Sequence, residues 1–170
     1  MRARQRERCS MILLLMIGLI SGCSAKEEKS AELFGVDGYY SLPDKIIVYR
    51  QGDKEEIDQE DRLYHQIIQA LNQMFVEAKD IGITQCAIDE YSEKEAKEAL
   101  ALEFIYSDTY KFHYTDWESE ISGKYCRLFI PLNRPSHTPV IFFGDEKEYF
   151  SGPIGISTEP RELIELINPS

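Results

Sequence analysis

The clearest pattern of apolar and polar positions predicts one long amphipathic helix, between Gln59 and Lys79. Apolar residues recur there at spacings of four, four, three and four, at Leu63, Ile67, Leu71, Met74 and Ala78. Because an α-helix turns once in about 3.6 residues, these spacings put the apolar side chains on one face. Asp58 stands where it could cap the N-terminus, and Gly82 follows the C-terminal end. The apolar face requires a sheet or a second helix to cover it.

Shorter segments predict strands and two brief helices. The alternation of Tyr110, Phe112 and Tyr114 with polar neighbours has a period of two, which is typical of a half-buried strand. We expect further strands at 45–49, 83–88, 100–106 and 124–132, a hairpin with arms at 140–143 and 148–151, and short helices at 92–99 and 160–167.

These segments predict an α+β fold. The strands cluster late in the chain, are joined by short turns and do not alternate regularly with helices, which argues against a doubly wound parallel sheet. We predict an antiparallel sheet of about five strands, with the long amphipathic helix and the short helices packed on it. The chain has 170 residues, the size of one ordinary domain. We place this single globular domain at 35–170.

The first residues follow a different pattern. Four arginines, at positions 2, 4, 6 and 8, precede an apolar run from Met11 to Ile20. The run is too short to span a bilayer as a helix, which takes about 20 apolar residues. A basic start, a short apolar stretch and small residues behind it are typical of a secretory signal peptide.

The end of this run, Ile20-Ser21-Gly22-Cys23, resembles the lipobox of bacterial lipoproteins. The resemblance implies that the thiol of Cys23 receives a diacylglycerol and that a peptidase cuts between Gly22 and Cys23. Residues 1–22 would then be the signal peptide and residues 23–34 a lipidated polar tether. The protein would sit on the extracytoplasmic face of the cell membrane, held by acyl chains such as palmitate. The alternatives are a signal anchor, or an ordinary signal peptide with an incidental cysteine.

Charge narrows the choice of partners. The full chain has a formal net charge of −11, and loss of residues 1–22 removes four arginines and one glutamate, which makes the remainder more acidic still. A strongly acidic body is repelled by the phosphates of nucleic acids, so we expect no nucleic-acid partner.

Two cysteines, Cys86 and Cys126, remain in the exported part once Cys9 leaves with the leader and Cys23 is acylated. Disulfides persist outside the cytoplasm, so this pair could form a bridge. The alternative is two buried thiols, because free cysteine packs as a small apolar side chain. The sequence does not decide between them.

Motifs for catalysis are missing from the sequence. The three histidines, His65, His113 and His137, form no ligand pair for zinc, and no phosphate loop or nucleophile elbow occurs. We therefore assign no catalytic residue, metal or cofactor. A nucleophile built from Cys126 and His113 is disfavoured, because acidic surroundings raise the pKa of a thiol.

The sequence thus favours a non-catalytic lipoprotein whose extracytoplasmic domain binds a protein or another component of the envelope. Aromatic side chains are enriched at interfaces, and four of them form our candidate partner surface: Tyr114, Trp117, Tyr149 and Phe150. The alternative function is an envelope hydrolase whose site is assembled from residues far apart in sequence. A deep pocket on which His113, Asp116 or Cys126 converges, with a perturbed pKa, would favour it.

Overall fold

The computed structural model describes residues 40–84, 86–115, 120–132 and 139–168. These residues form a seven-stranded sheet in the order β2-β1-β4-β5-β6-β7-β3, with antiparallel neighbours throughout. The strands are β1 (Lys45–Arg50), β2 (Asp53–Asp58), β3 (Ile81–Ile83), β4 (Leu100–Thr115), β5 (Glu120–Pro131), β6 (Val140–Gly144) and β7 (Ile154–Ile156). The helices are α1 (Arg62–Glu77), α2 (Glu90–Ala99) and α3 (Arg161–Ile167).

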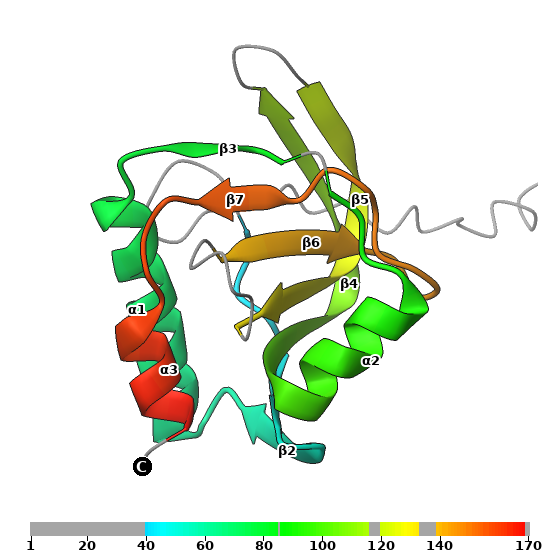
Figure 1. The fold of residues 1–170 in the computed structure, drawn as a ribbon. Helices are drawn as coiled ribbons and strands as arrows, with labels where there is room; N and C mark the ends of the chain where they lie inside the picture. Colours follow the sequence, from blue (N-terminus) through cyan, green and yellow to red (C-terminus); the bar gives the residue numbers. More distant parts are fainter. Residues whose placement is uncertain (1–39, 85, 116–119, 133–138, 169–170) are drawn as a thin grey trace, which may run out of the picture.

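Helices cover both faces of the sheet. Helices α1 and α3 lie side by side on one face, and α2 lies on the other (Figure 1). Successive residues of the central strands alternate between these two layers: Leu128 and Ile130 pack into the core under α1 and α3, whereas Phe129 packs into the smaller core under α2. The predicted α+β class is confirmed.

The sheet has seven strands where the sequence predicted about five. Strand β2 was missed because its sequence, DKEEID, is charged and lacks an apolar alternation. It is an edge strand, exposed except at Ile57, and its backbone pairs with β1 across the two-residue turn Gln51–Gly52. The expected strand at 148–151 is reduced to one bridge between Gly144 and Tyr149, and the chain pairs again only at β7.

Both longer helices begin at residues other than those expected. Asp58 is the last residue of β2, and Asp61 caps α1 by accepting a hydrogen bond from the backbone N–H of Leu63 at 2.7 Å. Helix α2 begins at Glu90 instead of residue 92, and Asp89 caps it by accepting a hydrogen bond from the Ser92 N–H at 2.7 Å. In both cases the carboxylate satisfies an N–H group that has no partner inside the helix.

The segments expected as strands at 100–106 and 110–114 form one continuous strand, β4, with a register shift against β5 between Ile105 and Tyr110. Beyond the shift the two strands continue as a hairpin arm, residues 110–115 and 120–125, which projects past the rest of the sheet (Figure 1). The predicted alternation holds in this arm. Tyr114 lies on its inner side and donates a hydrogen bond to the Ile81 carbonyl of β3 at 2.6 Å.

Residues 40–43, the N-terminal strap, are held between the α1 layer and the sheet. Tyr40 is buried, stacks on Phe75 with ring centroids 5.9 Å apart, and donates a hydrogen bond to Asn72 Oδ1 at 2.6 Å. The strap therefore packs on α1 through a side chain at its first described residue.

Tyrosine hydroxyls satisfy the backbone of the strap. The Ser41 N–H donates to Tyr125 Oη at 3.0 Å, and the Ser41 carbonyl accepts from Tyr106 Oη at 2.8 Å. The Pro43 carbonyl accepts from Tyr64 Oη at 2.6 Å. Buried backbone groups need such partners, and here side chains supply what a neighbouring strand would otherwise provide.

The leader, the tether and the proposed domain start at residue 35 lie outside the described residues. Among the residues that the structure does describe, none of the helices has the length and apolar character needed to cross a bilayer.

We predict that Tyr106→Phe lowers the free energy of unfolding by about 1–3 kcal/mol, because the buried Ser41 carbonyl loses the hydroxyl that donates to it. Urea denaturation measures the change. Tyr110→Phe is the matched control on the same face of β4: its ring is half-buried, and we expect a change within about 0.5 kcal/mol. Equal effects of the two substitutions would contradict the assigned role of the Tyr106 hydroxyl.

Candidate functional site

The most unusual group in the described fold is a buried carboxylate, Glu103, on the interior strand β4. Glu103 is only 4% exposed to solvent. Its strand neighbours Leu102 and Phe104 point into the core under α1, so Glu103 points to the opposite face, beneath α2. Our sequence analysis did not single it out. The sequence did contain a signal for it: Glu103 is the one charged residue in the otherwise uncharged run 100–106. A carboxylate inside an apolar strand needs hydrogen-bond or ionic partners.

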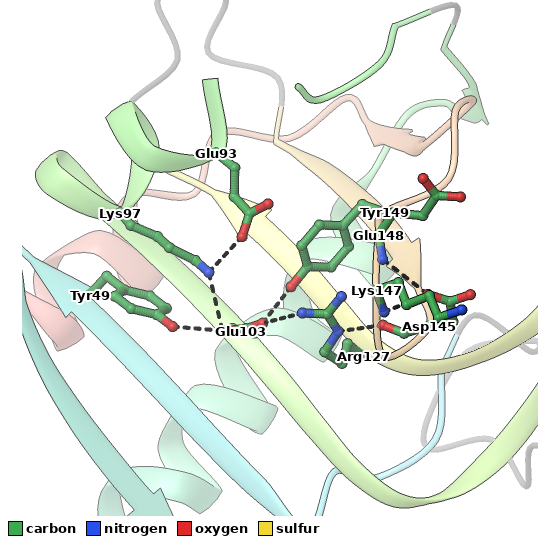
Figure 2. A network of polar contacts seen from close by, with 9 residues as sticks. All are labelled: Tyr49, Glu93, Lys97, Glu103, Arg127, Asp145, Lys147, Glu148 and Tyr149. Carbon is green, nitrogen blue, oxygen red and sulfur yellow. Dashed lines mark hydrogen bonds and ion pairs between the residues drawn. The ribbon is translucent and has the colours of Figure 1, made fainter. Parts of the chain in front are cut away.

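Four side chains surround this carboxylate, as Figure 2 shows. Oε2 accepts a hydrogen bond from Tyr49 Oη at 2.6 Å and lies 3.6 Å from Lys97 Nζ. Oε1 accepts from Tyr149 Oη at 2.5 Å and lies 3.6 Å from Arg127 Nη1. Each oxygen therefore has one hydroxyl donor and one cation. We call these five residues the Glu103 network.

The two cations are held by further contacts. The Lys97 ammonium is 2.7 Å from Glu93 Oε1 and lies 4.9 Å from the centroid of the Tyr49 ring. The Arg127 guanidinium lies 4.7 Å from the Tyr149 ring centroid, and its Nε donates to the Asp145 carbonyl at 2.5 Å. Cation–π contacts of this kind contribute most where the cation is partly desolvated.

The turn after β6 positions Tyr149. The Asp145 carboxylate accepts from the backbone N–H groups of Lys147 and Glu148, at 2.7 and 3.0 Å. A Cβ atom at Gly144 would stand 2.6 Å from Cδ1 of the Tyr149 ring, so glycine is required for the ring to lie against the backbone. The turn that the sequence predicted at 144–147 is thus the support for one donor of the network.

The electrostatics fix the protonation states. Burial raises the pKa of Glu103, but the hydrogen bonds from Tyr149 and Tyr49 and the charges of Lys97 and Arg127 outweigh it, and the net pKa lies below its ordinary value. Burial and the adjacent carboxylate raise the pKa of both tyrosines. Glu103 is therefore ionised and the tyrosines are protonated at neutral pH. A general acid or base needs a pKa near the working pH. This arrangement therefore suits a structural role, in which hydrogen bonds and ion pairs join strands and helix α2, rather than proton transfer.

A hollow adjoins the network. It measures about 380 Å³, lies between α2 and the β1–β2 turn, and is lined by Tyr49, Gly52, Glu93, Lys94, Lys97 and Glu98. Through Lys97 and Tyr49 the buried network reaches solvent. The lining combines both signs of charge, and the cation of Lys97 is already engaged by Glu93 and Glu103. This hollow offers polar contacts and no reactive group.

The described residues of the candidate partner surface lie on two faces of the sheet, Tyr149 on one and Tyr114 and Phe150 on the other. Tyr149 is 9% exposed and holds Glu103, which replaces our expectation that it faces a partner. Phe150 is half-buried and stacks on Phe112 at 6.4 Å, on the other face of the sheet. Tyr114 is half-buried against β3, and Trp117 lies outside the described residues. The described aromatic side chains of this set complete the two cores.

The residues of the alternative hydrolase are not brought together in the described structure. His113 is exposed on the outer side of the hairpin arm, with Nδ1 3.7 Å from Glu120. Cys126 packs against the core under α1, and burial raises the pKa of its thiol. Asp116 and His137 lie outside the described residues. Within the described ranges, no three His, Cys, Asp or Glu side chains are grouped so that they could hold a metal ion.

Cys86 and Cys126 are both partly buried. They pack against different cores, Cys86 under α2 and Cys126 under α1, because their segments turn these side chains to opposite faces of the sheet. The bridge and the pair of separate thiols both stay predictions, and the packing of the two side chains on opposite faces is the observation that bears on them.

We predict that Glu103→Gln lowers the free energy of unfolding by about 3 kcal/mol, because Lys97 and Arg127 lose the charge that they share. The matched control is Glu98→Gln, which removes an exposed ion pair with Lys94 and should change stability by less than about 0.5 kcal/mol.

The wild type and Glu103→Gln should also differ in how their stability depends on pH. A folded-state pKa below the ordinary value of 4.5 stabilises the fold above that pH, and the contribution is lost as the pH falls through the folded-state pKa. Below pH 4.5 the wild type should therefore lose stability more steeply than Glu103→Gln in thermal melts recorded at a series of pH values. If the melting temperatures of the two proteins fall in parallel as the pH is lowered, Glu103 is not the source of this pH-dependent stability.

We predict that both cysteines react with iodoacetamide in denaturant without reductant, and that the intact mass is unchanged by reduction. In the native protein, Cys126 should react more slowly at neutral pH than in the denatured chain, because burial raises its pKa. A mass lower by two hydrogens before reduction would instead establish the bridge.

Comparison with known proteins leaves the family open. No protein-family model matches the chain, and no curated protein matches it. Among solved structures, the fold is similar to the crystal structure of YycH from Bacillus subtilis, with a TM-score of 0.49 and 15% sequence identity. The similarity covers 83% of this chain and 39% of that one.

Proposed function

We propose that this protein is a membrane-anchored bacterial lipoprotein with a non-catalytic extracytoplasmic domain that binds a protein or envelope partner. The observation that carries the proposal is the motif Ile20-Ser21-Gly22-Cys23 behind a basic and apolar leader. Acylation of Cys23 would attach more than one chain. Stable anchoring requires such a double signal, because a single myristoyl chain gives only marginal binding.

The polar groups of the domain support binding rather than catalysis. The buried carboxylate of Glu103 has all its partners in place and a lowered pKa, and the described cysteines and histidines do not converge on a pocket. A fold stabilised in this way presents a fixed surface to a partner.

The charge of the domain supports its position next to the bilayer. In the full chain Asp and Glu outnumber Lys and Arg by 30 to 19, and the leader accounts for four of the arginines and one of the glutamates. Anionic headgroups therefore repel the domain while the lipid would hold its N-terminus. The tether would then keep the domain near the membrane with its surface accessible to other envelope proteins.

We predict that the full-length protein, expressed in bacteria, incorporates labelled palmitate and enters the detergent phase on partition. Cys23→Ala should abolish both, because the thioether cannot form. The control is Cys9→Ala, which removes a cysteine from the same leader and should leave labelling intact. A mature protein that begins upstream of Cys23, or that has no acyl mass on it, would overturn the proposal.

A further inference from the structure

Strand β2 forms one end of the seven-stranded sheet, opposite the end formed by β3 (Figure 1). Within the described residues β1 is its one strand neighbour, so the other side of β2 has backbone groups without a strand partner. All of its residues are exposed except Ile57. An unpaired side of this kind is a template for another strand. We call it the β2 edge.

The hydrogen bonds of the neighbouring strand show which groups point outward. The N–H of Gln51, directly after β1, donates to the Ala99 carbonyl at 2.9 Å, on the side of β4. Backbone groups of an antiparallel strand alternate between its two sides, so those of Arg50 point toward β2 and bond Asp53, its partner in the register. The turn Gln51–Gly52 has positive φ at both residues, as in hairpins closed by such a pair.

This alternation, continued along β2, directs the N–H and C=O groups of Lys54 and Glu56 outward. No hydrogen bond within the described residues uses these groups. The carbonyl of Asp58, at the end of the strand, already accepts from the Asp61 N–H at 3.0 Å. The β2 edge thus offers the backbone of two residues, Lys54 and Glu56, to another strand.

The same two residues have opposite charges on one face of the sheet. Ile57 packs into the core under α1, so the side chains of Lys54 and Glu56 project on the α2 side. Lys54 Nζ is 2.8 Å from Glu56 Oε1, and about half of each side chain remains exposed. A lysine and a glutamate placed two residues apart make this edge complementary in charge to an antiparallel copy of itself.

We infer that β2 pairs antiparallel with β2 of a second copy of this chain, about a two-fold axis at Glu55. Lys54 of each copy then lies opposite Glu56 of the other, and each such pair exchanges both N–H···O bonds. The neighbouring registers that keep these bonds set Lys54 opposite Lys54 or Glu56 opposite Glu56, which like charges disfavour. Glu55 meets its own copy on the other face, where its carboxylate is ion-paired with Arg50.

A two-fold axis perpendicular to the sheet suits two anchored copies. It leaves the α1 layers of both copies on the same side of the combined sheet, and the N-terminal strap lies on that side. Both tethers could then reach one membrane under the proposed function, and attachment to one surface would raise the effective concentration of the copies. The pairing itself goes beyond that function and does not require acylation. Repulsion between two acidic domains opposes it, and physiological salt screens this repulsion beyond about 8 Å.

The test places a cysteine at the proposed axis. Opposed residues of a non-hydrogen-bonded antiparallel pair have Cα atoms about 4.5 Å apart, within the range that a disulfide spans. Glu55→Cys in the full-length chain, expressed in bacteria and treated with copper phenanthroline, should therefore give a dimer on a non-reducing gel that reductant removes. The wild type, treated in the same way, gives the background from the native cysteines.

The matched control is Asp53→Cys, on the same strand and the same face. In the proposed register the two copies of residue 53 lie about 13 Å apart along the strands, so the yield of dimer should be at least about tenfold lower than for Glu55→Cys. An edge whose charges only prevent pairing gives no Glu55→Cys dimer. That result, or equal yields from the two positions, would overturn the inference.

A charge exchange tests the register in the Glu55→Cys background. Lys54→Glu and Glu56→Lys each set like charges opposite one another, and each alone should lower the yield of dimer at least about threefold. The double variant Lys54→Glu/Glu56→Lys restores opposite charges, and its yield should return to within about twofold of the parent. Both side chains are exposed, so the fold should keep its stability.

Lys94→Glu and Glu98→Lys provide the charge control. This exposed ion pair lies on α2, and each substitution changes the net charge by the same amount as its counterpart in β2. We expect each to change the yield by less than about twofold. Failure of the double exchange in β2 to restore cross-linking, or an equal loss from the α2 variants, would contradict the pairing of Lys54 with Glu56 across the axis.

Discussion

The fold depends on the neutralisation of one buried charge. Strand β4 has helices on both sides, and near its N-terminal end it holds the buried carboxylate of Glu103. Such a charge is tolerated only with close partners, and its partners come from β1, α2, β5 and the turn after β6. The network therefore sets the position of α2 on the sheet, and the lowered pKa of Glu103 keeps this cross-link charged at neutral pH.

On the other face of the sheet, tyrosine side chains satisfy buried polar groups. The N-terminal strap has no strand partner, and hydroxyls of tyrosines from α1, β4 and β5 satisfy its backbone groups. The strap enters the α1 layer directly after the segment that would lead from the lipidated cysteine.

These features fit a domain whose role is recognition. Its strongest electrostatic interactions, those of the Glu103 network, are internal and complete. The excess of acidic residues would steer a basic partner toward the domain and away from anionic surfaces. The lipid anchor and the repulsion between the acidic domain and the bilayer are consistent with one another under the proposed function.

The sequence by itself determined the elements that have their own periodicity: helix α1, the alternation of Tyr110, Phe112 and Tyr114, and with them the α+β class. The leader with its lipobox-like end stays a prediction from the sequence. Tertiary structure decided the rest. Edge strand β2 exists because β1 offers it a backbone partner, and Tyr149 is buried because Glu103 accepts its hydrogen bond. Local patterns report which face of a segment is apolar, whereas pairing and charge neutralisation depend on residues that only folding brings together.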